Sequence, residues 1–240
     1  MKLLLILPAY NEKDNIVNTV DQIRRFQKSN PTVVEVDYLV INDGSTDTTE
    51  QVCRENDIKC LSLIQNLGIG GAVQTGYIYA FMNGYDIAVQ FDGDGQHDVN
   101  SLPDLIAPIL SGEADFTVGS RFVEKGKTFQ STFLRRVGIR HLSLLIRLVS
   151  GLKISDVTSG YRAANKKTIA FLAKNYPTDY PEPESVVTLK KNKFRIKEVQ
   201  VNMFERAAGK SSISSWKSIY YMCKVSFAII CASIQKREVK

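Results

Sequence analysis

The chain has 240 residues, enough to bury a full apolar core in one large or two small domains. Its composition, 44% apolar and 23% charged without low-complexity tracts, excludes fibrous and intrinsically disordered proteins. The net charge of +6 is uneven, because residues 190–240 hold twelve Lys and Arg against three Glu, which leaves residues 1–189 with a net charge of −3.

A second basic cluster, in residues 121–153, bears on the kind of partner. It holds eight Lys and Arg, opposed only by Glu124. Two such clusters predict an anionic partner. No nucleic acid is expected, since aromatic side chains are not interleaved with the basic ones as a base-stacking groove requires. Phosphate groups or an anionic membrane surface fit the pattern better.

The cysteines and the N-terminus bear on the compartment. The apolar run at residues 3–7 lacks a small-residue cleavage site, so we expect a first strand that stays in the mature protein. Four cysteines show neither CxxC nor zinc-ligand spacing, which favours reduced thiols in the cytoplasm. They are Cys53, Cys60, Cys223 and Cys231.

Strand-like apolar runs alternate with helical segments in the first half of the chain. Asn11 is expected to cap a helix that runs to about residue 28, and Asp47 with Glu50 to open the next helix. This alternation predicts an α/β fold with a mainly parallel sheet and helices on both faces. The predicted strands are residues 2–7, 34–41, 58–64, 85–91 and 115–118, and further helices are residues 69–83 and 101–110.

The second half has a mixed pattern with a helical tail. The apolar stretch 219–234 is short for a membrane span and is interrupted by Lys224. Lys217, Lys224 and Gln235 share one stripe, which suits an amphipathic helix in a membrane interface, although packing against this protein or a partner subunit fits equally. The other predicted elements are a loop at 122–131, a basic amphipathic helix at 133–149, a helix at 182–191 and a strand at 194–203.

The most informative motif follows the predicted strand 85–91. Asp92 and Asp94 stand at alternate positions, so both carboxylates can reach one ion. Oxygen ligands suit Mg²⁺ or Mn²⁺, and Mg²⁺ takes few protein carboxylates and completes its shell with waters and substrate phosphates. A calcium loop is excluded, because His97 stands where it needs Gly and Pro103 where it needs Glu. We expect His97 to orient the loop.

Polar clusters follow four of the predicted strands. They are residues 8–12, 42–47, 92–98 and 119–121. Because ligands bind beyond the carboxyl ends of parallel strands, these clusters predict one site. Residues 66–71 are glycine-rich but lack the dinucleotide fingerprint, since Val73 replaces its third glycine. Gly70 and Gly71 permit either backbone approach to a nucleotide or close helix packing.

Taken together, these motifs resemble the inverting glycosyltransferases of family 2, which have the Rossmann-like GT-A nucleotide-sugar fold. Within that family the chain is most similar to polyprenyl-phosphate (dolichol-phosphate-type) sugar synthases, which move one sugar from a nucleotide donor to a lipid phosphate. The matching motifs, in family order, are PAYNE (8–12), NDGSTD (42–47), NLGIGGA (66–72), DGDGQH (92–97), GSRF (119–122), DVTSGYR (156–162) and ERAAGKSS (205–212).

The resemblance implies a division of the chain and roles for particular residues. Residues 1–212 would form the GT-A catalytic domain, and residues 213–240 an amphipathic helix associated with a membrane or partner. The implied metal ligands are Asp92, Asp94 and Gln96, and the implied catalytic residues are Asp94, Asp156 and Arg121. The implied acceptor-phosphate residues are Arg121 and Arg135. The implied nucleotide-sugar residues are Pro8, Tyr10, Glu12, Asp43, Gly70, Asp92, Arg206 and Ser211.

The motifs leave open which acceptor and which donor the protein uses. A phosphate acceptor, with a second pKa of about 6, needs little help from a base, whereas a sugar hydroxyl would need one, for which Asp156 is the candidate. A non-catalytic nucleotide-sugar-binding subunit is the third alternative. The resemblance favours a UDP donor with glucose or N-acetylglucosamine, for cell-surface glycan synthesis.

Related lipid-phosphate enzymes often carry membrane-spanning helices after the catalytic domain, and here only the short tail follows. We therefore expect peripheral attachment to the inner face of the cell membrane, as a homo-oligomer or with a small membrane partner subunit.

Overall fold

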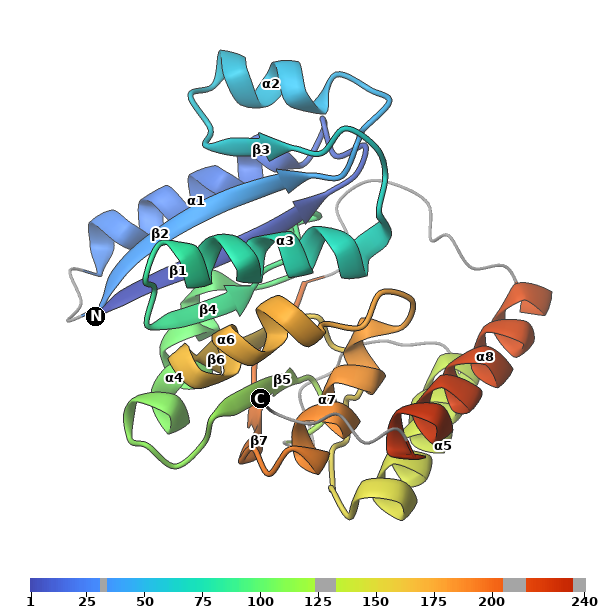
Figure 1. The fold of residues 1–240 in the computed structure, drawn as a ribbon. Coiled ribbons are helices and arrows are strands. Elements are labelled where there is room, and N and C mark those ends of the chain that lie inside the picture. Colours follow the sequence, from blue (N-terminus) through green and yellow to red (C-terminus); the bar gives the residue numbers. More distant parts are fainter. Residues whose placement is uncertain (31–33, 124–132, 205–214, 235–240) are drawn as a thin grey trace.

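The computed structural model describes residues 1–30, 34–123, 133–204 and 215–234. A seven-stranded sheet, in the order β3-β2-β1-β4-β6-β5-β7, forms the centre of the molecule (Figure 1). The pairings of β6 with β4 and β5 are antiparallel, and the other four pairings are parallel. The predicted mainly parallel sheet is therefore confirmed. The strands are β1 (Lys2–Ala9), β2 (Glu35–Asn42), β3 (Cys60–Ser62), β4 (Ile87–Gln90), β5 (Phe116–Ser120), β6 (Arg162–Asn165) and β7 (Ile196–Gln200).

Two apolar clusters cover the two faces of the sheet. In β1, Leu3, Leu5 and Leu7 belong to one cluster, whereas Leu4 and Ile6 belong to the other, as the period of two in a strand requires. The first cluster holds α1 (Ile16–Ser29), α2 (Thr49–Glu55) and α4 (Leu102–Leu110) against the sheet. The second holds α3 (Gly68–Met82), α5 (Phe133–Ser150), α6 (Lys166–Asn175), α7 (Pro181–Lys191) and α8 (Ser215–Ile234).

The predicted cap of the first helix is wrong. Helix α1 begins at Ile16, and Asn11 lies in the preceding turn with a positive φ of 57°. The side-chain oxygen of Asn11 instead accepts N–H bonds from Thr46 at 2.9 Å and Asp47 at 3.2 Å. Asn11 therefore ties the loop after β1 to the loop after β2, which a local capping rule cannot foresee.

The start of α2 differs from the prediction by one residue. Its N-cap is Thr48, and Asp47 accepts the backbone N–H of Thr49 at 2.9 Å from outside the helix. Glu50 pairs with Arg54 one turn later, at 3.7 Å, and is exposed.

Strand β6 and helix α6 have no counterpart among the predicted elements. Strand β6 has the sequence Arg-Ala-Ala-Asn, too short and too small in its side chains for a period-two signal. Its burial comes from its place between β4 and β5. Because β6 is antiparallel, its amino end lies at the edge where β4 and β5 have their carboxyl ends. The motif at residues 156–162 thereby joins the other motifs.

A carboxylate before β5 fastens three strands of the sheet. Asp115 accepts the backbone N–H of Arg195 at 2.9 Å, its Nη2 at 2.9 Å and the side-chain amide of Asn165 at 3.0 Å. The side-chain hydrogen bond to Arg195 is the main reason why the pKa of Asp115 falls from 3.8 to about 2. Since the folded state holds the proton less tightly, the stabilisation is complete above pH 3.8 and is lost as the pH falls towards 2.

We predict that Asp115→Asn lowers the free energy of unfolding at pH 7 by about 1–2 kcal/mol, a value reduced because the Arg195 side chain is exposed. Urea unfolding at pH 7 and at pH 3 measures this. The difference in free energy of unfolding between variant and wild type should be smaller at pH 3 than at pH 7. An equal difference at both pH values would contradict the electrostatic explanation.

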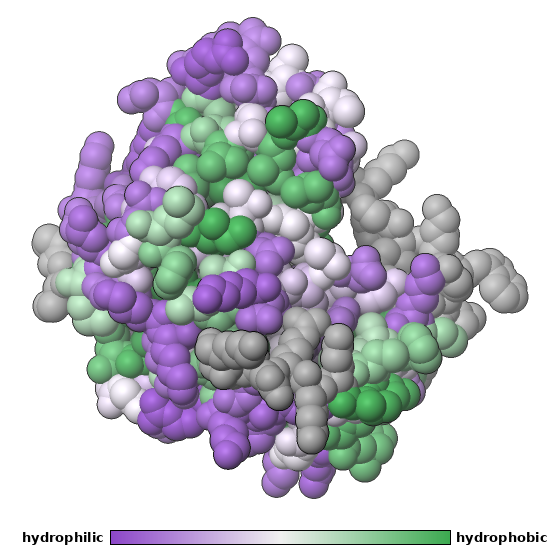
Figure 2. Space-filling model, in the orientation of Figure 1, coloured by the Kyte–Doolittle hydropathy of each residue, from purple (hydrophilic) through white to green (hydrophobic). Residues whose placement is uncertain are grey.

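Helix α8 packs against the rest of the molecule by one face. Val225, Ile229 and Ala232 are buried in the same cluster as residues of α5 and α7. The opposite face is exposed and includes Phe227 and Ile234, and Figure 2 shows an apolar patch over this part of the molecule. No helix among the described residues is both long and apolar enough to cross a membrane. The predicted domain boundary at residue 212 lies outside the described residues.

Candidate functional site

An open cavity of about 230 Å³ lies at the carboxyl ends of β1, β2 and β4. The strand order reverses at β1, because β2 and β3 lie on one side of it and β4 lies on the other. Open α/β sheets bind ligands at such a reversal. The loop after each of these strands contributes to its wall, together with the start of α3. The lining residues are Pro8, Ala9, Tyr10, Glu12, Asp43, Ile69, Ala72, Asp92, Gly93 and Asp94. The structure thus brings together six predicted site residues from three motifs.

Asp43 joins two of these motifs. Its side chain is buried, and its Oδ1 accepts the N–H of Leu67 at 2.7 Å. Burial raises the pKa of Asp43, while the backbone N–H groups of Leu67 and Gly68 act in the opposite direction. The glycine-rich motif therefore contributes backbone groups that fix a cavity-lining carboxylate.

Gly70, a predicted nucleotide-sugar residue, lies close to the backbone of residues 177–178. It is buried, and a Cβ there would come within 2.3 Å of the carbonyl oxygen of Thr178 and 2.6 Å of that of Pro177. Gly70 is not among the described residues that line the cavity. This contact is the close packing that the sequence left open as one alternative, and the nucleotide-binding role of Gly70 stays a prediction.

The carboxylate loop is held by His97. The N–H of Asp92 donates to His97 Nδ1 at 3.0 Å, so the hydrogen of a neutral ring is on Nε2, which lies 3.6 Å from Asp92 Oδ2. Burial lowers the pKa of His97 from 6.5 to about 4, and Arg121 contributes in the same direction. Asp94 and Asp156 act in the opposite direction. A neutral imidazole that accepts a backbone N–H supports the expected loop-orienting role.

An aromatic cluster supports the same loop from below. The His97 ring stacks on Tyr161, with centroids 4.7 Å apart and planes 10° from parallel. Phe91 meets both rings edge-on at 5.5 Å. The Tyr161 hydroxyl donates to the carbonyl oxygen of Asp98 at 3.2 Å. The motif at 156–162 therefore packs directly against the carboxylate loop.

A buried amide holds the carboxylate of Asp92. Tyr176 donates its hydroxyl to Gln90 Oε1 at 3.2 Å, which leaves Gln90 Nε2 directed at Asp92 Oδ1 at 3.3 Å. Gln90 is fully buried, whereas the Asp92 side chain keeps 30% of its surface exposed towards solvent. One oxygen of Asp92 is thus oriented from inside the protein.

Gly160 is the second support of Asp92. A Cβ at this position would lie 2.7 Å from Asp92 Oδ2 and 2.9 Å from Gln90 Nε2, closer than real contacts allow. The loop follows this path because buried Arg162 donates to the carbonyl oxygens of Val157 at 3.0 Å and Ser159 at 2.7 Å. The short Asp92 side chain cannot move aside without leaving its place in the cavity.

We predict that Gly160→Ala lowers kcat/KM roughly 10- to 100-fold, the usual effect of disturbing the residues that orient a ligand side chain. Steady-state kinetics with the nucleotide-sugar donor that the sequence resemblance implies measure the loss. Gly112→Ala is the control for a glycine substitution, since a Cβ there meets no atom of the described residues within 4 Å, although its φ is positive. Wild-type kinetics for Gly160→Ala would contradict the described contact.

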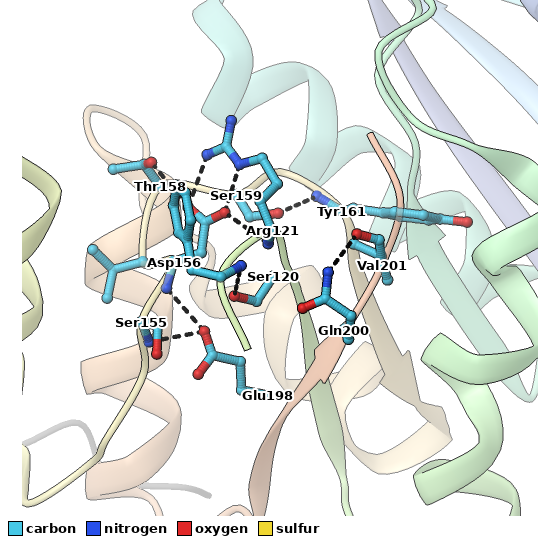
Figure 3. A network of polar contacts seen from close by, with 12 residues as sticks. Ser120, Arg121, Ser155, Asp156, Thr158, Ser159, Tyr161, Glu198, Gln200 and Val201 are labelled. Carbon is cyan, nitrogen blue, oxygen red and sulfur yellow. Dashed lines mark hydrogen bonds and ion pairs between the residues drawn. The ribbon is translucent and has the colours of Figure 1, made fainter. Parts of the chain in front are cut away.

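Arg121 and Asp156 form a buried ion pair at the same edge (Figure 3). Arg121 Nε donates to Asp156 Oδ2 at 2.7 Å, and Nη2 donates to Oδ1 at 2.8 Å. Arg121 follows β5 and Asp156 precedes β6, so antiparallel pairing of these strands brings them together. Both carboxylate oxygens accept hydrogen bonds from the guanidinium, and the Asp156 side chain is fully buried, which does not favour a role as a base towards a substrate.

Three predicted site residues lie outside what the structure describes. Arg206 and Ser211 are in the segment 205–214, and the side chain of Arg135 is not described although its backbone belongs to α5. Before this segment, the N–H of Phe204 donates to the carbonyl oxygen of Gln96 at 2.7 Å. Residue 204 is therefore fastened to the carboxylate loop.

The donor set fits a hard divalent cation held by few protein groups. Asp92 and Asp94 both line the cavity, and Asp94 Oδ1 accepts the N–H of Gln96 at 3.0 Å. Gln96 itself is half-buried and is not among the described lining residues. Within the described ranges, no group of three or more His, Cys, Asp or Glu side chains is arranged to hold an ion alone. Two carboxylates suit an ion whose shell includes water and substrate phosphates.

Sequence reasoning missed several supporting residues of this site. Gln90 offered a signal, since it is the one amide in the apolar run before Asp92. Gly160 lies within the motif at residues 156–162, and the sequence alone assigns it no role there. Glu198, which accepts backbone N–H groups beside Asp156, offered no signal, because its partners lie about forty residues away in sequence.

Comparison with known proteins identifies the family. The model for glycosyl transferase family 2 matches residues 4–171. UDP-N-acetylglucosamine–dolichyl-phosphate N-acetylglucosaminyltransferase of Methanococcus voltae is 31% identical, over 90% of this chain and 92% of that protein. Undecaprenyl-phosphate mannosyltransferase of Micrococcus luteus is also 31% identical, over 89% of this chain and 88% of that protein.

A solved structure supports the fold. Glucosyl-3-phosphoglycerate synthase from Mycobacterium tuberculosis, in complex with Mn²⁺, UDP-glucose and phosphoglyceric acid, matches 99% of this chain and 81% of its own, with a TM-score of 0.71 and 19% identity. The expected GT-A architecture is thereby confirmed. With the matched family model and two relatives along nearly their whole length, the chain belongs to glycosyltransferase family 2 and is a glycosyltransferase.

Proposed function

We propose that this glycosyltransferase transfers one monosaccharide from a nucleoside-diphosphate sugar to a polyprenyl phosphate, with inversion at the anomeric carbon. The observation that carries the proposal is the cavity that Asp92 and Asp94 line together with Tyr10, Glu12 and Asp43. It offers carboxylates for an ion beside groups suited to a nucleoside. The relatives named for dolichyl phosphate and undecaprenyl phosphate support the lipid acceptor.

For the donor we propose UDP-glucose or UDP-N-acetylglucosamine. The Methanococcus voltae relative is named for UDP-N-acetylglucosamine, and the structural neighbour contains UDP-glucose with Mn²⁺. Asp92, Asp94 and Gln96 would hold Mg²⁺ or Mn²⁺ together with the donor diphosphate. Bound there, such an ion neutralises charge on the departing nucleoside diphosphate.

The pairing of Asp156 favours a phosphate over a sugar hydroxyl as the nucleophile. A hydroxyl needs a general base, and both oxygens of Asp156 already accept hydrogen bonds from Arg121. A phosphate monoester, with a second pKa of about 6, is largely ionised at neutral pH. Its oxygen attacks the anomeric carbon while the bond from that carbon to the diphosphate oxygen breaks. The products are a sugar-phosphate lipid and a nucleoside diphosphate.

A panel of nucleotide sugars tests the proposal. Purified protein is incubated with each donor, a short polyprenyl phosphate, and Mg²⁺, Mn²⁺ or EDTA. We expect a solvent-extractable sugar lipid and an equal amount of nucleoside diphosphate from one uridine donor, and neither with EDTA. Transfer to a hydroxyl of a lipid-linked glycan, with none to polyprenyl phosphate, would overturn the acceptor. Absence of donor turnover with every acceptor would favour a non-catalytic binding subunit.

We further propose that α5 and α8 together lie on the membrane that contains the acceptor. Gly138 of α5 lies beside Met222 of α8, and His141 Nε2 is 3.1 Å from Ser226 Oγ, so the two helices run side by side in the same direction. Their outer faces expose apolar side chains, Val137, Leu144, Leu148, Phe227, Ile230 and Ile234. Exposed Arg140 and Arg147 flank this stripe, which suits acidic lipid head groups.

Flotation with vesicles tests the membrane surface. We expect wild-type protein to float with phosphatidylcholine vesicles that contain phosphatidylglycerol, and the double variant Leu148→Glu/Phe227→Glu to remain at the bottom. Met82→Glu is the matched control, because Met82 is an exposed apolar residue of α3. Equal flotation of both variants would overturn the proposal, and so would a wild-type dimer in sedimentation that the double variant abolishes.

A further inference from the structure

The loop that carries Asp156 is anchored by a carboxylate from a distant strand. Glu198 Oε1 accepts the N–H of Ser155 at 2.8 Å and that of Asp156 at 2.9 Å (Figure 3). One oxygen thus binds two consecutive backbone groups. A single acceptor that binds two consecutive backbone N–H groups fixes an irregular loop at both residues.

The sheet places this anchor beside the partner of Asp156. Strand β7 pairs in parallel with β5, with Glu198 opposite Val118, three residues before Arg121. Arg121 and Glu198 are therefore carried by neighbouring strands, and the 155–156 segment is held between them. The backbone N–H of Arg121 also points to Asp156 Oδ2, at 3.3 Å. Movement of the loop by one ångström would break the two-point contact with the guanidinium.

We propose that Glu198 is a positioning residue for the Arg121–Asp156 pair: it fixes the loop so that Asp156 holds the guanidinium in the orientation that receives the acceptor phosphate. This inference rests on the proposed transfer to a polyprenyl phosphate, with Arg121 as the acceptor-phosphate residue that the family resemblance implies. Among the described residues, Glu198 bonds to the backbone of Ser155 and Asp156 and is not part of the cavity lining, so it acts through Asp156.

Two substitutions separate the hydrogen-bonding role of Glu198 from its charge. Glu198→Ala removes the oxygen that binds both N–H groups. Glu198→Gln keeps a carbonyl oxygen in the same place without the negative charge. Because positioning depends on the accepting oxygen, we expect Glu198→Ala to lower kcat/KM for the acceptor roughly 10- to 100-fold, with the KM for the donor unchanged, as small misplacements of catalytic groups do. Glu198→Gln should stay within about threefold of wild type.

A double-mutant cycle tests whether the effect passes through Asp156. If it does, Glu198→Ala should change the residual activity of Asp156→Asn by less than about twofold. If Glu198→Ala caused its full 10- to 100-fold loss of kcat/KM in the Asp156→Asn variant as well, the inference would be overturned. Equal losses of kcat/KM for the acceptor and for the donor would also overturn it. Kinetics are measured below the unfolding temperature of each variant, so that a loss of folded protein does not imitate a loss of orientation.

Hydrogen exchange gives a readout that does not depend on turnover. The amides of Ser155 and Asp156 should exchange faster in Glu198→Ala and at the wild-type rate in Glu198→Gln. Unchanged exchange in Glu198→Ala would overturn the inference even if the enzyme makes sugar lipid. If wild-type protein makes no sugar lipid, the proposed function fails, and the exchange rates still decide whether Glu198 fixes the loop.

Discussion

Asp92→Asn is expected to lower kcat/KM roughly 1000-fold, because the loss of several kcal/mol of charge stabilisation corresponds to about three powers of ten in rate. Asparagine has nearly the same size as aspartate, and its carbonyl oxygen can still accept from Gln90, which donates to Asp92 Oδ1. The contacts beneath the loop should therefore persist. What disappears is the negative charge at a side chain that lines the cavity.

Binding of a metal ion gives a second measurement of the Asp92→Asn effect that does not depend on activity. Mn²⁺ titrated into protein with UDP, followed by electron paramagnetic resonance, should show binding weakened at least about tenfold in Asp92→Asn. Asp104→Asn is the matched control, since Asp104 is an exposed carboxylate in the first turn of α4. Unaltered Mn²⁺ binding together with normal kinetics in Asp92→Asn would remove this residue from the proposed ion site.

Asp156→Asn should destabilise the protein by about 3–5 kcal/mol, because it leaves the guanidinium of Arg121 buried without its counter-charge. This loss of stability is expected whether the acceptor is a phosphate or a sugar hydroxyl. From the sequence alone this substitution distinguishes a hydroxyl acceptor from a phosphate acceptor, on the assumption that Asp156 is only a base. The ion pair removes that distinction, because Arg121 would lose its orientation in either case.

Urea unfolding measures this effect, with two further variants. Thr158→Val is the control, since Thr158 makes only a 3.4 Å contact with Asp156 Oδ1, and its cost should stay below about 1 kcal/mol. Arg121→Gln/Asp156→Asn should recover part of the stability lost in Asp156→Asn, because no unpaired charge stays buried. Strict additivity of the two single substitutions would contradict the ion pair.

Much of the fold was accessible from local patterns. The predicted strands at residues 2–7, 34–41 and 85–91 overlap β1, β2 and β4, and helices α3 and α4 begin within one residue of their predicted starts. Strand β6 and the start of α1 were not accessible in this way. The first is buried only because β4 and β5 flank it, and the second begins late because Asn11 bonds to the next loop instead of the helix.

The sequence by itself determined the chemistry of the site. Asp92 and Asp94 at alternate positions after an apolar strand, with three further polar clusters after strands, predicted oxygen ligands at one edge of a parallel sheet. These inferences depend on neighbours in the chain and on the direction of parallel strands, both of which a sequence encodes locally. The cavity that Asp92 and Asp94 line together with Asp43 agrees with them.

Only the tertiary structure decided how these groups are held. The antiparallel direction of β6 brings Asp156 to Arg121 and Gly160 to Asp92, and the pairing of β7 with β5 brings Glu198 to the same loop. Each of these contacts joins residues 35 or more positions apart in sequence. Such contacts depend on strand order and direction, which arise from the packing of the whole sheet and leave no periodic signal in the chain.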